Sequence, residues 1–224
     1  MTNSQICLVV TKIKIEVAEP AGRRERKRLE TREKLFQAAV QLFAKQGFAA
    51  TKVEDITEAA DVAKGTFFNY FPSKEHVLMY FASRQLGKVE ACMEKAKEGK
   101  EPIDRLLRVM AHDLLSLPAR TPDLARSMMG SFMGNEEVRN VIREEIAGRG
   151  RNLLAQVFEI AQKRGEARRD VAPYEMARVF QQTMFGTMLL WTLNPAEPLS
   201  GILDRTISVL WNGMRAGGDA QKRK

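Results

Sequence analysis

Apolar residues recur every three or four positions along most of this chain, a spacing that places them on one face of an α-helix. The pattern is clear from Thr31 onward and predicts a first helix that Gly47 ends, because glycine readily adopts the left-handed backbone of helix ends. The aromatic ring of Phe48 is then expected to fold back onto Phe43.

Two shorter helices follow closely. Thr51 and Glu54, three positions apart, are expected to form a capping box that opens the second helix. Residues 63–71 are expected to form a third, short helix, and Ser73 is expected to cap a fourth over residues 74–97. Two short helices joined this tightly form a helix-turn-helix.

The rest of the chain repeats the helical pattern, so we expect an all-α protein. Glycines 148 and 150 are expected to kink or break one long segment. Further helices are predicted over residues 103–117, 123–133, 136–164, 173–193 and 199–214.

The pattern divides the chain into three parts. Residues 1–21 carry a weak strand-like alternation with no second strand to pair with, and are expected to be a disordered or loosely packed extension. Residues 22–80 are expected to form the helix-turn-helix domain. Residues 81–224 are expected to form a larger helical domain.

The positive charge of the chain is concentrated near its start. The formal net charge is +8, and residues 22–34 hold seven Arg or Lys and three Glu, whereas residues 35–80 carry a net charge of −1. A basic arm of this kind suits an anionic partner such as nucleic acid. The alternative interpretation is a helix start that is merely solvated.

Composition excludes several classes of protein. No apolar run approaches the roughly 18 residues of a membrane span, and residues 6–10 are too short an apolar block for a secretory signal, so a cytoplasmic protein is expected. Cys7 and Cys92 have no metal-ligand spacing and are not expected to form a disulfide. His76 and His112 lack a recognisable nucleophile partner, so neither an enzyme, a cofactor nor a metal site is expected.

The segment AKGTFFNYF (63–71) carries the chemistry of the helix-turn-helix. Phe67 and Phe71, four positions apart, are expected to pack inward together. The outer side keeps polar donors that could reach base edges and phosphates in a DNA major groove, and Gly65 permits a close approach of backbones. A helical hairpin that packs on a partner protein is the alternative. The residues left for the outer side and its margins are Lys64, Thr66, Phe68, Asn69 and Tyr70.

The stretch TREKLFQAAVQLFAKQGFAATKVEDITEAADVAKGTFFNYFPSKEHVL (31–78) closely resembles the DNA-binding domain of TetR-family transcriptional regulators. The family pattern is a helix ending in GF, a threonine opening the second helix, an aliphatic-alanine pair, then glycine-valine-serine, then GT followed by an aliphatic and an aromatic residue, and finally a phenylalanine and SKE. The preceding basic arm also fits the family. RGEARRDVAP (164–173) before a long apolar helix is typical of its C-terminal half.

The chain departs from the family pattern at four positions. Asp61 replaces the usual turn glycine, and aspartate tolerates the left-handed backbone. Ala63 replaces the usual serine cap, at a cost of about 1 kcal/mol. Thr57 replaces a small alanine, and Phe68 replaces a tyrosine whose hydroxyl would contact a phosphate.

The resemblance implies roles for residues of the DNA-facing surface. Lys64 and Asn69 are the candidates for reading bases, and Gly65 serves close approach. The candidates for holding phosphates are Thr51, Thr66, Tyr70 and Lys74, and Phe68 completes the surface.

The last two helices are unusually apolar, with no charged residue between Arg178 and Glu197. A heptad-like seam in the last helix is expected to pair with its two-fold mate, as in family members, so that a homodimer reads two half-sites. Burial of this helix in the core of a single chain is the alternative. The seam consists of Leu203, Ile207, Leu210 and Met214.

Methionines are frequent in the helices that surround a ligand cavity in this family, and methionine adapts to irregular apolar shapes. They predict either a cavity for an apolar or amphipathic molecule or a methionine-filled core. His112, Asp113 and Arg126 are polar candidates beside it. The candidate lining residues are Met110, Met128, Met129, Phe132, Met133, Met184, Met188 and Trp191.

The resemblance therefore implies a homodimeric repressor that binds a palindromic operator in double-stranded DNA and is released by a small-molecule effector, with no membrane partner. The alternative is an architectural or nucleoid-associated DNA-binding protein of the same fold that needs no ligand.

Overall fold

The computed structural model describes residues 22–217, and within that range it is helical apart from turns and one isolated β-bridge between Ala167 and Arg215. The expectation of an all-α fold is confirmed. The extension expected over residues 1–21 lies outside the described residues. The helices are α2 (Arg23–Gln46), α3 (Val53–Ala59), α4 (Lys64–Tyr70), α5 (Lys74–Glu98), α6 (Ile103–Leu115), η1 (Pro118–Arg120), α7 (Pro122–Gly134), α8 (Glu136–Val141), η2 (Ile142–Gly150), α9 (Arg151–Lys163), α10 (Pro173–Leu193) and α11 (Leu199–Met214).

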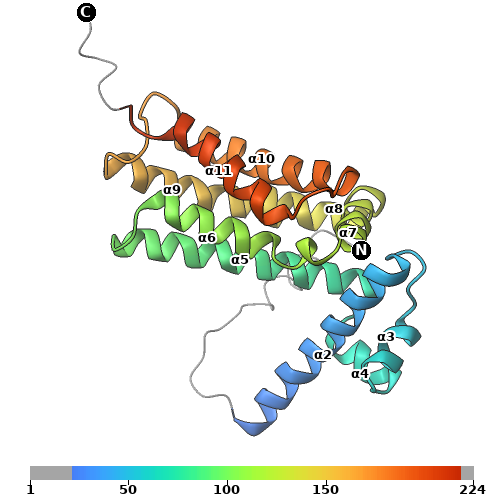
Figure 1. The fold of residues 1–224 in the computed structure, drawn as a ribbon. Helices are drawn as coiled ribbons and strands as arrows, with labels where there is room; N and C mark the ends of the chain where they lie inside the picture. Colours follow the sequence, from blue (N-terminus) through green and yellow to red (C-terminus); the bar gives the residue numbers. More distant parts are fainter. Residues whose placement is uncertain (1–21, 218–224) are drawn as a thin grey trace, which may run out of the picture.

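The helices form two groups that share α5. Figure 1 shows α2, α3 and α4 at one end of the molecule, while α5, α6, α9, α10 and α11 lie roughly side by side in a bundle. Helix α5 begins directly after α4 and then runs through the bundle, so one continuous helix connects the helix-turn-helix to the larger group.

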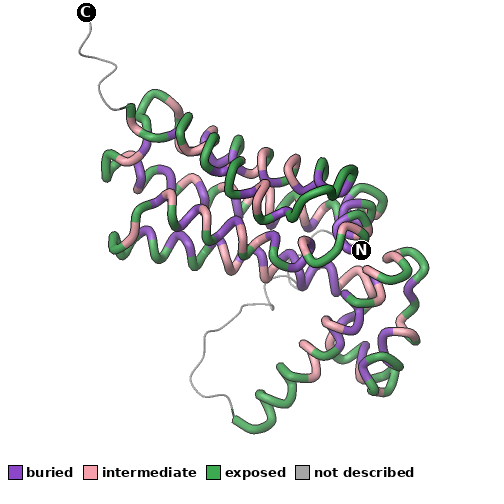
Figure 2. The backbone as a smooth tube through the Cα atoms, in the orientation of Figure 1, coloured by how far each residue is buried: buried purple, intermediate pink, exposed green. Residues whose placement is uncertain are grey.

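Helix α2 begins at Arg23, eight residues before the position that the apolar pattern indicates. Residues 23–30 are all exposed, as the green first turns of α2 show in Figure 2. Arginine, lysine and glutamate form helices well, yet a fully solvated turn leaves no apolar stripe in the sequence. The basic arm is therefore helical, and its first turns point away from the bundle.

The turn between α2 and α3 differs in part from expectation. Gly47 has a positive φ of 84°, and the Phe48 ring packs on Phe43 with centroids 5.0 Å apart, as expected. The expected capping box is wrong. The hydroxyl of Thr51 donates to the carbonyl of Gly47 (2.7 Å), and the N–H of Lys52 donates to the Asp55 carboxylate (2.9 Å).

The core beneath the helix-turn-helix is aromatic. Phe67 and Phe71 are buried, as their spacing predicts, with ring centroids 5.7 Å apart. Tyr80 of α5 contacts Phe71 at 5.8 Å and Phe36 of α2 at 5.3 Å. Asp61 has a φ of 49° and occupies the turn between α3 and α4 in place of glycine. This chain of rings fixes α4 against α2 and α5.

The start of α5 also differs from expectation. It begins at Lys74, but the hydroxyl of Ser73 makes no bond to a backbone N–H and lies 3.0 Å from Nδ1 of His76. Farther along the chain, the helix expected over residues 136–164 changes pitch instead of breaking. It continues as α8, then as the π-helical η2, then as α9.

Helix η2 packs closely on α5. A Cβ added at Gly150 would lie 3.3 Å from the carbonyl oxygen of Glu145 and 3.8 Å from a methyl carbon of Leu86. The glycine thus permits the widened turn to sit against the connecting helix.

The proposed dimer seam requires a correction. Leu203, Ile207 and Met214 are 2%, 1% and 7% exposed and belong to the core of the single chain. Leu210 is half-buried and packs against the same core. A second copy could reach the three buried side chains only by unpacking the monomer, so the alternative of a monomer core holds for them.

None of the helices that the structure describes is both long and apolar enough to cross a membrane.

Candidate functional site

The outer side of α4 presents the residues that the sequence singles out. Lys64, Gly65 and Asn69 are exposed, and the Phe68 ring is 47% exposed. Thr66 and Tyr70 are half-buried at the margins of this surface. The structure therefore brings six of the eight predicted residues together on one short helix, with its aromatic side turned inward.

Lys64 is paired across the turn with Glu54 of α3. The hydrogen bond from the Lys64 ammonium lowers the pKa of the Glu54 carboxyl. Both side chains are more than half exposed, and exposed ion pairs contribute little to stability. The ammonium can therefore leave Glu54 for a stronger anion at small cost.

Gly65 is not required by the fold. A Cβ added at this position would meet nothing within 4 Å, and its φ is not positive. Glycine in a helix costs about 0.5–1 kcal/mol relative to alanine. Its presence on the outer face therefore fits a surface that another backbone approaches closely.

The structure places Thr51 and Lys74 differently from the other candidates. Thr51 is 1% exposed and its hydroxyl is bonded to Gly47. The ammonium of Lys74 donates to the carbonyls of Phe48 (2.9 Å), Ala49 (3.2 Å) and Thr51 (3.1 Å). It also lies 4.6 Å from the centroid of the Phe48 ring. Both residues hold the turn before α3 in shape, which corrects their assignment as direct phosphate contacts.

The basic first turns of α2 are anchored at their inner end. The guanidinium of Arg32 lies 4.8 Å from the centroid of the Tyr80 ring, and Glu33 pairs with Arg84 of α5 at 2.6 Å. Burial raises the pKa of Glu33, but hydrogen bonds from Arg84 and Gln37 outweigh it, so the pKa is lowered overall. The sequence did not predict the ion pair between Glu33 and Arg84, because the two residues are 51 positions apart in the chain.

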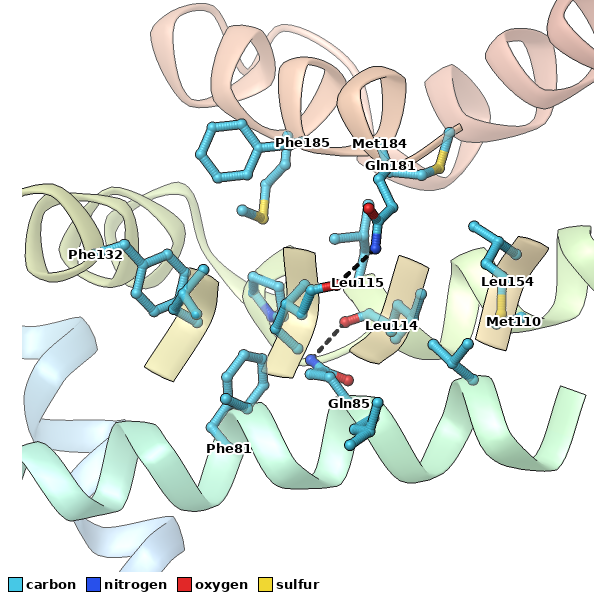
Figure 3. A pocket seen from close by; sticks show the side chains of 18 of the residues that line it. Phe81, Gln85, Met110, Leu114, Leu115, Phe132, Leu154, Gln181, Met184 and Phe185 are labelled. Carbon is cyan, nitrogen blue, oxygen red and sulfur yellow. Dashed lines mark hydrogen bonds between the residues drawn. The ribbon is translucent and has the colours of Figure 1, made fainter. Parts of the chain in front are cut away.

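A second feature is an apolar cavity of about 160 Å³ inside the bundle. Its walls come from α5, α6, η1, α7, η2, α9 and α10, and Figure 3 shows side chains converging on it. Five of the predicted lining residues lie there, namely Met110, Met128, Phe132, Met184 and Met188. The methionine-rich helices thus enclose a space and do not fill it completely.

Three predicted lining residues lie elsewhere. Met133 is 68% exposed at the end of α7, one position beyond Phe132 and so on another face. Met129 is buried in the core outside the lining. Trp191 is also buried, and its indole N–H donates to the carbonyl of Glu197 (3.0 Å).

Sequence reasoning missed the wall contributed by α5, which includes Phe81, Gln85 and Leu86. The available signal was the run VLMYFA (77–82), which is apolar around the whole helix and therefore predicts burial on every side. All six residues are buried in the structure.

The polar candidates beside the cavity are engaged elsewhere. Nε2 of His112 lies 2.9 Å from the Asp204 carboxylate, and Arg126 donates to the carbonyl of Thr192 (2.8 Å). Asp113 is exposed and outside the lining. The polar side chains in the lining are two glutamines, Gln85 and Gln181.

Metal-binding and thiol chemistry find no support in the part of the chain described. Across residues 22–217, no group of three or more His, Cys, Asp or Glu side chains is placed to hold a metal ion. Cys92 is buried in α5, and burial raises the pKa of its thiol to about 11. The thiol is therefore protonated at neutral pH.

The cavity and the helix-turn-helix are physically connected. Helix α5 lines the cavity and also carries Lys74 at its first turn. The backbone N–H of Phe48 donates to the hydroxyl of Ser127 (2.9 Å) on α7, beside the lining residue Met128. Movement of either helix would therefore reach the turn between α2 and α3.

Known proteins resemble this chain along most of its length. The model of bacterial regulatory proteins of the tetR family matches residues 35–80. The HTH-type transcriptional repressor KstR of Mycolicibacterium smegmatis is 29% identical over 184 residues, which covers 81% of this chain and 87% of KstR.

Two solved structures extend the similarity. FadR of Thermus thermophilus, a TetR family transcriptional repressor in complex with lauroyl-CoA, is 30% identical with a TM-score of 0.59, covering 84% of this chain and 97% of that one. FadR of Bacillus subtilis, in complex with stearoyl-CoA, shares the fold with a TM-score of 0.64 at 24% identity, covering 81% and 98%.

Proposed function

The chain belongs to the TetR family of bacterial regulatory proteins, and from that premise we propose that it is a homodimeric transcriptional repressor released from its operator by a small effector. The observation that carries the proposal is one helix, α5, that joins a DNA-facing helix-turn-helix to an apolar cavity. The cavity disfavours the ligand-independent architectural role. The protein acts by binding, without catalysis, on DNA in the bacterial cytoplasm.

The roles proposed for the residues of α4 follow from how far each side chain is exposed. Lys64 and Asn69 reach base edges from α4, where an amide can bond adenine and an ammonium can bond guanine. Thr66, Phe68 and Tyr70 contact the backbone at the margins of the groove. The exposed arginines of the first α2 turns add affinity that does not depend on sequence.

The effector we propose is apolar or amphipathic, because the cavity walls are almost entirely apolar side chains. Two relatives bind lauroyl-CoA and stearoyl-CoA, so a molecule with a long acyl chain is the first candidate. An occupant that spreads α5 from α7 would displace the turn held by Ser127 and Lys74. By linkage, an effector that favours that arrangement must weaken DNA binding.

Dimerisation is proposed through the outer faces of α10 and α11. These faces expose large apolar side chains in the single chain, with Leu190 at 66%, Leu193 at 71% and Val209 at 74%. A shallow groove runs between the two helices and is lined by Thr183, Arg205, Thr206, Val209 and Leu210. A second copy on this surface would place two copies of α4 for the half-sites of a palindrome.

The test uses the purified chain and the DNA upstream of its own gene. A footprint over a palindrome is expected, and addition of lauroyl-CoA or stearoyl-CoA should remove it. Coenzyme A alone serves as the control without an acyl chain. If no segment is protected, the repressor proposal fails; if protection survives both acyl thioesters, the effector belongs to another chemical class.

Replacing Gly65 with Ala should separate DNA binding from stability. The added methyl meets open space, so the melting temperature should stay the same or rise by a few degrees. Operator affinity should fall about tenfold if a DNA backbone approaches this position, which corresponds to about 1.4 kcal/mol. Thermal melting and fluorescence anisotropy measure the two effects, and unchanged affinity would remove Gly65 from the contact surface.

Replacing Met188 with Trp should fill the cavity and abolish the response to effector while operator binding persists. Overpacking a core costs about 1–3 kcal/mol, so a lower melting temperature is expected. The matched control is Met133→Trp, the same substitution at an exposed position outside the lining. Its response should match that of the wild type in a release assay, and equal responses in both variants would place the effector elsewhere.

A further inference from the structure

One buried polar atom in the cavity wall lacks a partner. Among the described residues, Oε1 of Gln85 is the buried side-chain nitrogen or oxygen that accepts or donates no hydrogen bond. Gln85 is 7% exposed and lies on the face of α5 that lines the cavity, as Figure 3 shows. A buried carbonyl left unpaired costs roughly 1–3 kcal/mol, so a partner is expected from within the cavity.

The other end of the same amide fixes its orientation. Nε2 of Gln85 donates to the carbonyl of Leu114 in the last turn of α6 (2.8 Å). In a continuing helix the N–H of residue 118 would take that carbonyl, but residue 118 is proline and has no N–H. Because the carbonyl of Leu114 needs the NH₂ group, Oε1 of Gln85 is the atom left over.

The second glutamine in the lining differs. Nε2 of Gln181 donates to the carbonyl of Ile146 (2.8 Å), and its Oε1 accepts from Nε of Arg151 (2.9 Å). Both ends of that amide are thus satisfied by the protein. Among the described residues, Oε1 of Gln85 is therefore the side-chain acceptor in the lining that the protein leaves unpaired.

We propose that the effector carries an O–H or N–H donor that binds Oε1 of Gln85 while its apolar part fills the cavity. This inference rests on the proposed function and names the polar half of the ligand. It favours alcohols and amides, including the amide N–H groups beyond the thioester of an acyl-CoA. It disfavours ethers and esters, which offer no donor.

Gln85 also orients the ligand. Together with Phe81 it lines a second, smaller recess, whose other walls include the cationic side chains Arg84, Lys88 and Arg120. The polar end of the effector therefore lies at the α5–α6 wall beside this recess, and its apolar end points towards α9 and α10.

Two isomers test the inference without any mutation. Decanol and methyl nonyl ether have the same atoms and nearly the same size, but only the alcohol can donate. Calorimetric titration of the full-length dimer should show decanol binding about 3- to 10-fold tighter, the range expected of one net hydrogen bond. Equal affinities for the two isomers would overturn this inference and leave the apolar cavity proposal standing. Failure of both to bind would overturn both.

Two matched variants locate the contact. Gln85→Met removes the free acceptor at nearly constant volume and should abolish the preference for the alcohol. Gln181→Met makes the same change at the glutamine with no free atom; it should lower the melting temperature but keep the preference. If Gln85→Met retains the full preference, Gln85 is not the contact. If that variant does not fold, the isomer comparison in the wild type and in Gln181→Met still decides.

Discussion

Replacing Val209 with Glu is expected to give a folded monomer that has lost most of its operator affinity. Val209 is 74% exposed in the single chain, so the substitution disturbs no monomer packing. At the proposed interface of α10 and α11 the carboxylate would instead be buried without a partner, which is strongly unfavourable. A lone helix-turn-helix reads one half-site, so affinity should fall by on the order of 10³, towards non-specific binding.

The matched control is Ile207→Glu, the same charge two positions earlier in α11. Ile207 is 1% exposed in the core of the single chain, and a buried unpaired charge there should unfold the protein or lower its melting temperature steeply. Sedimentation, thermal melting and operator titration separate the two outcomes. A Val209→Glu protein that remains dimeric would contradict the proposed interface, whereas a well-folded Ile207→Glu protein would contradict the monomer core.

Helix α11 shows why sequence pattern could not settle the interface. It carries two apolar stripes. One contains Leu203 and Ile207, which are buried, and the other contains Ile202 and Val209, one heptad apart. Periodicity reveals stripes but not their partners, because burial against one's own chain and against a second copy require the same residues. In the structure, the stripe that contains Leu203 and Ile207 packs into the core of the single chain.

The helix-turn-helix was more predictable because its determinants are local. The spacing of Phe67 and Phe71 fixed which side of α4 turns inward, and both are buried. Asp61 takes the left-handed backbone in its turn, as its residue type permits. These features depend on neighbours within a few positions, where propensity and periodicity carry information.

Other features depend on tertiary contacts that the sequence does not encode locally. The start of α2 at Arg23 leaves no apolar stripe, since those turns are solvated. Oε1 of Gln85 is unpaired because Nε2 of the same amide donates to the carbonyl of Leu114. That carbonyl needs a side-chain donor because Pro118, 33 positions from Gln85, has no N–H. The ammonium of Lys74 likewise donates to backbone carbonyls that lie 23 to 26 positions earlier in the chain. From the sequence, Lys74 was predicted to contact a phosphate, because these carbonyl partners are not visible in the local pattern.

Replacing Lys74 with Met should therefore weaken binding to operator and to random DNA without changing the salt dependence of binding. Methionine keeps much of the apolar stem but removes the three hydrogen bonds that hold the turn between α2 and α3. Loss of the charged donor should lower the free energy of unfolding by about 1–3 kcal/mol. Because no phosphate contact is lost, the slope of log affinity against log salt should stay constant.

The matched control for Lys74 is Lys64→Met, which removes the other lysine near this surface. Lys64 is exposed and paired with Glu54 alone among the described residues, so stability should hardly change, while operator affinity should fall. Chemical denaturation and DNA titrations at several salt concentrations give both quantities for each variant. A decrease of about one unit in the salt slope of Lys74→Met, with stability unchanged, would mean that its ammonium leaves the three carbonyls and neutralises a phosphate in the complex.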